Sequence, residues 1–462
     1  MFDFKGARVM VVGLGDTGLS MARWLQRRGA EVRATDSRAA PPHAATLRRE
    51  LPQVPLALGV APNVDGVDMI AVSPGVDRRA GAIAQAAARG VPVVGDVELF
   101  AQALAAGSDA PPVIAITGSN GKSTVTALAG EICKAAALRP VVAGNIGLPV
   151  LDALTEIEDG AGKGVLRPGV FVLELSSFQL ESTISLQARA ATVLNLSEDH
   201  LDRYDSMREY AAAKSRIFAG DGVQVLNRQD AWSEGMAQPG RRVVRFGLDA
   251  PRDAEAWGIV GGAGREQMLM RGDAALAPVA ALRVAGLHNA ANALAAGALC
   301  RAIGVADAAI TQAWRAFDGL PHRVKNINKI NNIQFYDDSK GTNVGATVAA
   351  LNGLPQPVVL IAGGDGKGQD FAPLAAAVQH RARAVVLIGR DAGRIAEAIG
   401  KRVPLLRAAD MEEAVELAFN AAKAGDAVLL SPACASYDMY RNYIHRAQVF
   451  AAAVAALQRR RA

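Results

Sequence analysis

Apolar and polar positions follow a recurring pattern: short runs of β-branched residues end in glycine-rich loops, and alanine-rich stretches follow them. Such runs are typical of buried strands and the stretches of helices, which together predict an α/β protein with mostly parallel sheets. The runs form three groups, separated by a Pro-, Gly- and Ser-containing linker at 105–112 and a Leu-Pro-His element near residue 320. We therefore expect three domains, at residues 1–104, 105–319 and 320–462.

Each group predicts its own set of strands. The first group has them near 8–12, 31–35, 68–72 and 91–94. The second has them near 113–116, 140–143, 170–174, 191–195 and 223–226. Residues 228–280 are polar and weakly patterned, and we expect a small antiparallel piece there. The third has strands near 333–336, 357–361, 384–388 and 427–430, then a helical tail to residue 462.

Composition limits the class of protein. Half of the 462 residues are hydrophobic and 21% are charged, which is enough for several packed cores. The net charge of +5 comes from scattered basic residues, which favours small anionic partners over a nucleic acid. The three cysteines lie far apart in the sequence, so we expect neither a disulfide framework nor a zinc site. With no apolar run near the ~18 residues of a membrane span, a cytoplasmic protein is expected.

A G-x-G-x-x-G motif, at Gly13, Gly15 and Gly18, follows the first predicted strand. Asp36 ends the next strand, at the spacing of an acidic residue that contacts a ribose. On these residues alone three interpretations stay open. The domain belongs to an NAD-dependent oxidoreductase, it binds another nucleotide, or the glycines only let a strand pack on a helix.

The stretch T-G-S-N-G-K-S-T at 117–124 follows a predicted strand and precedes a helical stretch from Val125. It lacks the first glycine of the usual G-x-x-x-x-G-K-[ST] loop, because that position is Ile116. Its backbone N–H groups can still cradle phosphate, Lys122 can neutralise it, and Ser123 or Thr124 can reach Mg²⁺. With 39 arginines and only 11 lysines in the chain, a lysine in this loop favours a phosphate site over an incidental turn.

Acidic residues follow two further strands of the second group. Glu174 lies in an otherwise apolar strand, where a carboxylate is costly unless it binds a metal or pairs with a cation such as an arginine. Asp199, His200 and Asp202 crowd together after the strand near 191–195. Alone they would be a solvated charge cluster, but beside Glu174 and Ser123 they indicate the rest of a magnesium site.

Five motifs occur in a fixed order: T-G-S-N-G-K-S-T, G-N-I-G, L-E-L-S-S-F-Q-L-E, E-D-H-L-D-R-Y and A-A-K-S-R-I-F. Together they resemble the Mur ligases of peptidoglycan synthesis, over essentially the whole chain. The family uses a shortened Walker-type loop, so Ile116 is no defect. The resemblance implies a Rossmann-like N-terminal domain, a central P-loop ATPase-type domain with a mostly parallel sheet, and a Rossmann-like C-terminal domain.

Within the family the chain is most similar to the members that add D-glutamate to UDP-N-acetylmuramoyl-L-alanine through an acyl phosphate made with ATP. Two sister activities fit less well. The diaminopimelate-adding enzymes usually carry D-N-P-R, which this sequence lacks, and the L-alanine-adding enzymes usually read G-G-x-G-M-S where this chain has G-D-T-G-L-S. A nicotinamide dehydrogenase would leave 117–124, Glu174 and His200 unexplained, and a non-catalytic nucleotide-binding regulator would leave the metal set idle.

The resemblance also implies roles for individual residues. The catalytic residues would be Lys122, His200 and Lys214. ATP would be bound by Gly118, Ser119, Asn120, Gly121, Lys122, Ser123, Thr124, Asn289, Arg323, Asp338 and Lys340. Two Mg²⁺ ions would be held by Ser123, Glu174, His200 and Lys214. The UDP-substrate would contact Gly15, Thr17, Asp36, Ser37, Arg38, Ser73, Gly75, Asn145 and Gln179. D-glutamate would be captured by Thr342, Lys367, Ser436 and Tyr443.

The family carries a carbamylated lysine at the place of Lys214. A free amine has a pKa of about 10.4, and as an ammonium it would repel Mg²⁺. Addition of CO₂ gives an anion with two oxygens, a hard ligand suited to magnesium, and arginine cannot undergo this change. The alternative is an ordinary lysine on a surface helix.

Two stretches depart from the family pattern. Residues 158–169 look like an inserted surface loop, and 247–275 match no motif. Apart from these we expect a monomer whose third domain closes over the first two, to keep water from the acyl phosphate. Its partners would be the UDP-sugar, D-glutamate and ATP, with no nucleic acid and no membrane span.

Overall fold

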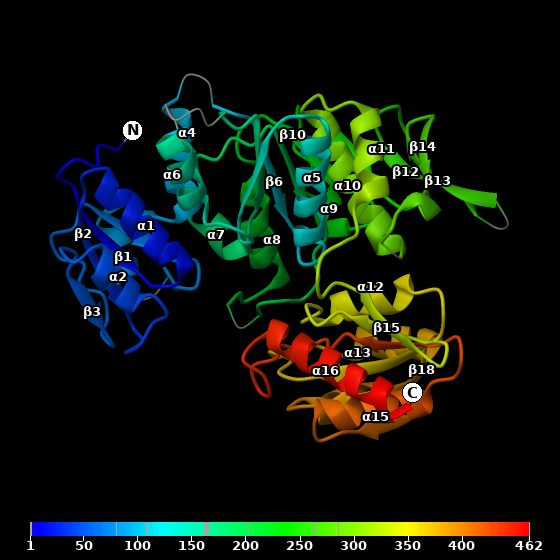
Figure 1. The fold of residues 1–462 in the computed structure, drawn as a ribbon. Helices are drawn as coiled ribbons and strands as arrows, with labels where there is room; N and C mark the ends of the chain where they lie inside the picture. The colour runs from blue at the N-terminus through cyan, green and yellow to red at the C-terminus, as the bar shows by residue number, and fades with distance from the viewer. Residues whose placement is uncertain are drawn as a thin grey trace.

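The computed structural model describes residues 2–79, 81–107, 110–160, 166–201, 203–262, 265–284 and 286–461. Three sheets, each from its own stretch of sequence, are flanked by helices (Figure 1). This confirms the predicted three-part α/β architecture. The predicted boundaries fall between the sheets and remain predictions. No described helix is both long enough and apolar enough to cross a membrane.

The first sheet has five parallel strands in the order β3-β2-β1-β4-β5. The strands are β1 Arg8–Val12, β2 Glu31–Asp36, β3 Leu56–Leu58, β4 Met69–Val72 and β5 Val93–Val94. The helices are α1 Asp16–Arg27, α2 Ala44–Glu50, α3 Gly81–Ala88 and α4 Asp96–Ala105. Because β1 pairs with both β2 and β4, the strand order reverses beside β1, which opens a crevice at the carboxyl ends of the strands.

The middle sheet has nine strands in the order β14-β13-β12-β11-β10-β9-β6-β8-β7. They are β6 Val113–Thr117, β7 Pro140–Gly144, β8 Val170–Glu174, β9 Ala190–Val193, β10 Val223–Asn227, β11 Val243–Phe246, β12 Trp257–Gly262, β13 Arg265–Arg271 and β14 Ala274–Pro278. Pairing is parallel from β7 to β12 and antiparallel from β12 to β14. The expected antiparallel piece is therefore confirmed for β12–β14, but β11 extends the parallel part.

Helices cover both faces of the middle sheet (Figure 1). They are α5 Lys122–Ala135, α6 Val150–Gly160, α7 Ser177–Glu181, α8 Met207–Ser215, α9 Ala231–Glu234, α10 Leu287–Ala302 and α11 Asp307–Ala316, with 3₁₀ turns at Arg216–Phe218 and Val279–Ala281. Helix α5 packs on α10, where the buried thiols of Cys133 and Cys300, distant in sequence, lie 3.8 Å apart. The expected inserted loop at 158–169 is partly wrong, because 158–160 continue α6; residues 161–165 lie outside the described residues.

The third sheet has the order β15-β16-β20-β17-β18-β19, parallel except for the β15–β16 hairpin. Its strands are β15 Lys325–Ile330, β16 Ile333–Asp337, β17 Val358–Gly363, β18 Ala382–Ile388, β19 Leu405–Arg407 and β20 Ala427–Leu430. Its helices are α12 Val344–Gly353, α13 Ala372–Arg381, α14 Ala392–Ile399, α15 Met411–Ala421 and α16 Tyr443–Arg461, the predicted helical tail. Figure 1 shows this unit beside the middle one, with α12 facing it.

A continuous apolar cluster joins the first two units, because α4 and α6 pack between their sheets. The rings of Phe100, on α4, and Phe171, on β8, meet edge to face at 5.1 Å. The third unit has separate apolar clusters on the two faces of its own sheet. Its contacts with the middle unit include polar ones, and several of these lie at the loop 117–124.

Candidate active site

The loop 117–124 joins β6 to α5, and its shape depends on two glycines. Gly118 and Gly121 have φ angles of 150° and 83°, which L side chains rarely adopt. A Cβ on Gly121 would also lie 2.6 Å from Oδ1 of Asn292 on α10. Helix α5 begins at Lys122, so its N-terminal N–H groups open into the loop. With the shortened glycine spacing the loop still opens onto the start of a helix, as the predicted phosphate site requires.

Lys122 lies inside this loop. Its Nζ donates hydrogen bonds to the carbonyl oxygens of Gly118, at 2.8 Å, and Ser119, at 2.9 Å. Burial lowers the pKa of the ammonium, and the nearby carboxylates of Glu174 and Asp199 oppose that shift. A cation held by neutral carbonyls at the start of a helix is well placed to neutralise a phosphate.

Glu174 ends β8, directly beside β6, and is 1% exposed. Its partner is not an arginine: Oε1 accepts a hydrogen bond of 2.7 Å from Nδ2 of Asn145. Its Oε2 is buried with no hydrogen-bond partner among the described residues. A buried carboxylate oxygen without a hydrogen bond is costly, and Mg²⁺, which prefers such oxygens, could satisfy it.

Asp199 and His200 follow β9, the neighbour of β6 on its other side. The Nε2 of His200 lies 3.7 Å from Oδ2 of Asp199, and its ring meets Phe178 edge to face at 4.8 Å. Burial lowers the pKa of His200, which favours the neutral imidazole that can bind a metal. Asp202, grouped with these two from the sequence, lies outside the described residues.

Lys214, on α8, is not a surface lysine: it is 1% exposed. Its Nζ donates to Oγ1 of Thr117 at 3.2 Å and to the carbonyl of Gly118 at 3.0 Å, and it lies 4.8 Å from the centre of the Tyr210 ring. Its pKa is lowered well below the usual value, first by burial and then by the charge of Lys122. The amine is thus buried beside the loop 117–124, and no carboxylate of the described residues forms a hydrogen bond or ion pair with it.

Two polar side chains of the third unit contact the loop 117–124, and another contacts Asp199 beside it. Nη2 of Arg323 donates to Oγ of Ser123 at 2.8 Å. Nδ2 of Asn343 donates to Asn120 at 3.1 Å, and Nζ of Lys367 lies 3.5 Å from Oδ1 of Asp199. The middle and third units therefore meet across the predicted phosphate site.

A cavity of about 240 Å³ lies between these two units. Of the predicted ATP residues it is lined by Asn120, Gly121, Thr124, Asn289, Arg323, Asp338 and Lys340. The Nζ of Lys340 lies 3.9 Å from the centre of the Tyr443 ring. Burial raises the pKa of Asp338 to about 7 and lowers that of Lys340 to about 8. Both groups change protonation near neutral pH, so a phosphate chain bound here would shift their charge.

The four residues expected to capture D-glutamate follow adjacent strands of the third sheet, or begin the helix after one. Thr342 follows β16, Lys367 follows β17, and Ser436 and Tyr443 follow β20. Backbone hydrogen bonds tie these loops together: Ala433 N donates to Gly341 O, and Asp365 and Ala435 exchange two. The loops thus converge, although the ammonium of Lys367 points to Asp199 of the middle unit.

A second cavity, of about 930 Å³, lies at the carboxyl ends of β1, β2 and β4 and extends to the middle unit. All nine residues expected to contact the UDP-substrate line it.

Asp36, 3% exposed, accepts from Leu14 N at 2.7 Å and from the Arg38 guanidinium at 2.9 and 2.7 Å. The Arg38 side chain is the main cause of the depressed pKa of Asp36. A Cβ on Gly18 would lie 1.8 Å from the Gly13 carbonyl, so this motif position requires glycine.

Gln179 links this cavity to a residue that the sequence did not single out. Its Oε1 accepts from Ser176 N at 3.1 Å in a capping box of α7, and its Nε2 donates to Oδ2 of Asp96 at 3.1 Å. Asp96, on α4, is 1% exposed, and its Oδ1 has no hydrogen-bond partner among the described residues. Its only sequence cue is an acidic residue at the start of a helix, which is usually an ordinary helix-end residue.

Three family profiles match the chain in order. They are the Mur ligase MurD-like N-terminal domain at 7–95, the Mur ligase middle domain at 116–300 and the Mur ligase glutamate ligase domain at 322–434. The UDP-N-acetylmuramoylalanine--D-glutamate ligase of Methylobacillus flagellatus is 58% identical over 463 residues, which cover 100% of this chain and 99% of that one. The chain belongs to the Mur ligase family.

Other relatives agree with this assignment. The enzyme of the same name from Thiobacillus denitrificans is 58% identical over 474 residues, covering 100% of this Mur ligase and 98% of its own length. The solved UDP-N-acetylmuramate-alanine ligase of Thermotoga maritima superposes with a TM-score of 0.59 over 98% of this chain and 99% of its own. At 19% identity that likeness shows the three-unit α/β fold alone.

Among the described residues of this Mur ligase, the side chains that most often bind metals do not cluster at one place. No group of three or more His, Cys, Asp or Glu side chains with metal-binding geometry occurs in the part of the chain that the structure describes. The predicted metal set, Ser123, Glu174, His200 and Lys214, contains only two residues of those kinds. Its other ligands would have to come from a hydroxyl, a modified lysine and the phosphates of the substrate.

Proposed function

We propose that this Mur ligase joins D-glutamate to the L-alanyl carboxylate of UDP-N-acetylmuramoyl-L-alanine and converts ATP to ADP and phosphate. The observation that supports this most is the 58% identity, from end to end, to two curated ligases of that name. We expect the reaction to take place in the cytoplasm, in a monomer.

The chemistry divides into two displacements. An oxygen of the L-alanyl carboxylate attacks the γ-phosphorus of ATP, and the bond to ADP breaks. The amine of D-glutamate then attacks the acyl carbon, loses a proton, and phosphate leaves with the former carboxylate oxygen. We assign Lys122, the N–H groups from Gly118 to Thr124, and Arg323 to hold the phosphates in line and stabilise their charge.

The second displacement requires the amine and the acyl phosphate to meet at the junction of the units. We assign Thr342, Lys367, Ser436 and Tyr443 to D-glutamate, because their loops converge on the face that meets the middle unit. A dicarboxylate needs a cation together with hydroxyl and backbone donors, and these loops offer both. The 930 Å³ cavity of the first unit would hold the uridine end of the other substrate.

Magnesium fits the residues at the phosphate loop. Oε2 of Glu174 is buried without a hydrogen-bond partner among the described residues, so a cation there would satisfy it. We assign Glu174 and Ser123 to one ion, and His200 with Lys214 to a second. When bound, the ions supply positive charge that offsets the negative oxygens of ATP and of the acyl phosphate.

Lys214 would have to be carbamylated to serve this set. Its amine is buried, and among the described residues its hydrogen bonds go only to neutral oxygens, so as an ammonium it would have no directly bonded carboxylate there. Attack of the neutral amine on CO₂, with loss of a proton, forms a carbamate whose two oxygens can bind a cation. In the unmodified side chain Thr117 and the Gly118 carbonyl hold the nitrogen, and the single N–H of the carbamate could keep one of these two bonds.

A phosphate-release assay tests the proposed function. Purified enzyme with ATP, Mg²⁺ and UDP-N-acetylmuramoyl-L-alanine should release phosphate with D-glutamate and far more slowly with L-glutamate, L-alanine or diaminopimelate. A Lys367→Ala variant should raise the KM for D-glutamate, whereas Lys423→Ala, on the surface of the same unit, should not. Equal release with L-alanine or diaminopimelate, and none with D-glutamate, would reject the proposal.

A further inference from the structure

A third cavity, of about 460 Å³, lies in the middle unit, at the ends of the strands opposite to the loop 117–124. Pro112, Arg189 and Arg242 line it, and they stand immediately before β6, β9 and β11. Since these strands are parallel, the cavity lies at their amino ends, whereas the loop 117–124 lies at the carboxyl end of β6. A five-residue strand spans about 17 Å, so the two places are distinct.

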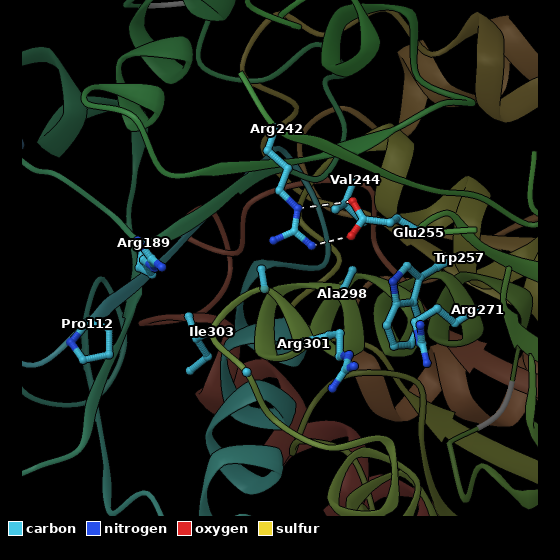
Figure 2. Close-up of a pocket in the computed structure, with 12 residues that line it drawn as sticks. Pro112, Arg189, Arg242, Val244, Glu255, Trp257, Arg271, Ala298, Arg301 and Ile303 are labelled. Carbon is cyan, nitrogen blue, oxygen red and sulfur yellow. Dashed lines mark hydrogen bonds and ion pairs between the residues drawn. The ribbon is translucent and has the colours of Figure 1, made fainter. Parts of the chain in front are cut away.

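Four arginines surround this cavity: Arg189, Arg242, Arg271 and Arg301 (Figure 2). The lining also contains the carboxylate of Glu255. Figure 2 shows Arg242 and Glu255 on one side of the small residue Ala298 and Arg301 on the other. No lysine of the described residues lines it, so the cations that can hold a ligand here are guanidinium groups.

Most N–H groups of these guanidiniums have no acceptor among the residues that the structure describes. Arg242 donates from Nε and Nη2 to Glu255, at 3.2 and 2.5 Å, which leaves Nη1 unused. Arg271 donates from Nη2 to Asp307 at 2.7 Å, and its buried Nε has no partner among the described residues. Each guanidinium has five N–H donors, so one or two bonds leave most of them available.

The two remaining arginines are even less satisfied. Arg301 donates from Nη1 to the Val305 carbonyl at 3.2 Å, and its Nε lies 3.9 Å from Asp307, too far for a hydrogen bond. Arg189 has no side-chain hydrogen bond or ion pair to any residue that the structure describes. Four guanidinium cations compare with two carboxylates, that of Glu255 in the cavity wall and that of Asp307, which is paired with Arg271. The cavity therefore keeps a net positive charge.

We propose that this cavity binds a small anion that carries two or more phosphate groups. Guanidinium groups recognise phosphate oxygens through paired N–H donors, and several phosphates are needed to use the donors of four arginines. The volume lies within the range of about 300–1,000 Å³ that is usual for small-molecule sites. The anion would come either from free polyphosphate or from a nucleotide.

The experiment must separate this site from the ATP site, because α10 borders both. The start of α10 lines the nucleotide cavity with His288 and Asn289, and its end lines the basic cavity with Ala298 and Arg301. We therefore saturate the enzyme with ADP and excess Mg²⁺ before adding inorganic triphosphate. Binding is followed by NMR of ¹⁵N-labelled indole groups, because Trp257 lines the basic cavity, whereas Trp24 is in the first unit.

The indole signal of Trp257 should shift in a saturable manner, and that of Trp24 should stay. The double variant Arg189→Ala/Arg301→Ala should bind triphosphate at least tenfold more weakly. The matched control Arg33→Ala/Arg315→Ala removes two exposed arginines elsewhere and should bind as the wild type does. Both variants should keep ligase activity, which shows that they fold.

Three results would overturn the proposal: no shift of Trp257, equal binding by the two double variants, or sulfate binding as tightly as triphosphate. Parallel titrations with triphosphate and GTP identify the source. Equal affinities mean that the phosphate groups alone are recognised, and tighter binding of GTP means a nucleotide ligand. Either result, if lost in Arg189→Ala/Arg301→Ala, supports the site.

Discussion

Replacement of Asp96 by asparagine should stabilise the protein at neutral pH. The carboxyl group is 1% exposed, and Nε2 of Gln179 is the side-chain donor that it faces. Burial raises its pKa from 3.8 to about 6, and the hydrogen bond from Gln179 opposes only part of that effect. The ionised carboxyl therefore costs stability, and Asp96→Asn removes the charge while keeping an oxygen that can accept from Gln179.

The size and sign of the effect follow from the two pKa values. Because the folded pKa lies above the unfolded one, the folded protein binds more protons between about pH 4 and 6, so this group costs stability as the pH rises. The cost is about 3 kcal/mol above pH 6 and about half of that at pH 5. The new amide N–H₂ group finds no acceptor where Oδ1 stood, which takes back about 1–3 kcal/mol at every pH. The advantage of asparagine should thus be about 1.4 kcal/mol larger at pH 7.5 than at pH 5.

Urea unfolding at pH 5 and 7.5 measures this difference. Glu98→Gln, on the same helix, is the matched control of opposite sign. Backbone N–H groups of Ile184 and Ser185 bond to Glu98 at 2.7 and 2.9 Å, and its pKa is lowered despite burial. The ionised Glu98 therefore stabilises the folded protein above the unfolded pKa, and this stabilisation is lost as the pH falls. Glu98→Gln should thus be most destabilising at pH 7.5. If Asp96→Asn unfolds with the same pH dependence as the wild type, the reasoning is refuted.

Enzyme kinetics should separate the two roles of Asp96. Asp96→Asn keeps an acceptor for Gln179, so the KM for UDP-N-acetylmuramoyl-L-alanine should stay near that of the wild type. Asp96→Ala removes the acceptor and should raise this KM several-fold with little change in kcat. A lowered kcat with unchanged KM in the alanine variant would contradict a role in holding Gln179.

Three further predictions concern the sites themselves. Calorimetry should show that UDP binds and NAD does not, since the residues assigned to ATP and metal lie in the other two units and the cavity of the first is assigned to the uridine end of the substrate; tight NAD binding without UDP binding would contradict this. Gly121→Ala should weaken ADP binding at least tenfold because its φ of 83° strains an L residue and a Cβ would also displace Oδ1 of Asn292, whereas Gly393→Ala, with open space around it, should not; equal affinities would contradict this argument. Lys214→Ala and Lys214→Arg should both lose most activity, and a small carboxylic acid should partly restore the alanine variant. Near-full turnover of Lys214→Arg, or an unmodified amine in mass spectra, would reject the carbamate.

The centre of the candidate site was predictable because it follows the strands of one sheet. The strands β9, β6, β8 and β7 are neighbours, so the residues after their carboxyl ends must meet. Lys122, Glu174 and His200 could therefore be grouped from local sequence alone. Motif order added the D-glutamate residues, whose strands are likewise adjacent.

Features that depend on packing between distant segments were not predictable. Neither the bond between Asp96 and Gln179 nor the contact of Cys133 with Cys300 has a local pattern. Four strands were missed: β3, β11, β15 and β19. They are short or lie at or near the edges of their sheets. Polar residues, such as those of Lys325–Ile330, are tolerated at such edges. The loop expected at 158–169 was partly wrong because its first residues extend an amphipathic helix.

The pairing of Lys367 with Asp199 bears on how amino-acid binding and domain closure depend on each other. The ammonium lies 3.5 Å from Oδ1 of Asp199, so a residue assigned to D-glutamate also holds the third unit to the middle one. A dicarboxylate that binds Lys367 must share this cation or displace Asp199 from it. In the first case the substrate adds a negative charge beside Asp199, and further positive charge at the loop 117–124 would offset the repulsion between the two. In the second case Asp199 is released toward His200 and the phosphate loop. Either way, the affinity for D-glutamate should depend on whether ATP and Mg²⁺ are bound.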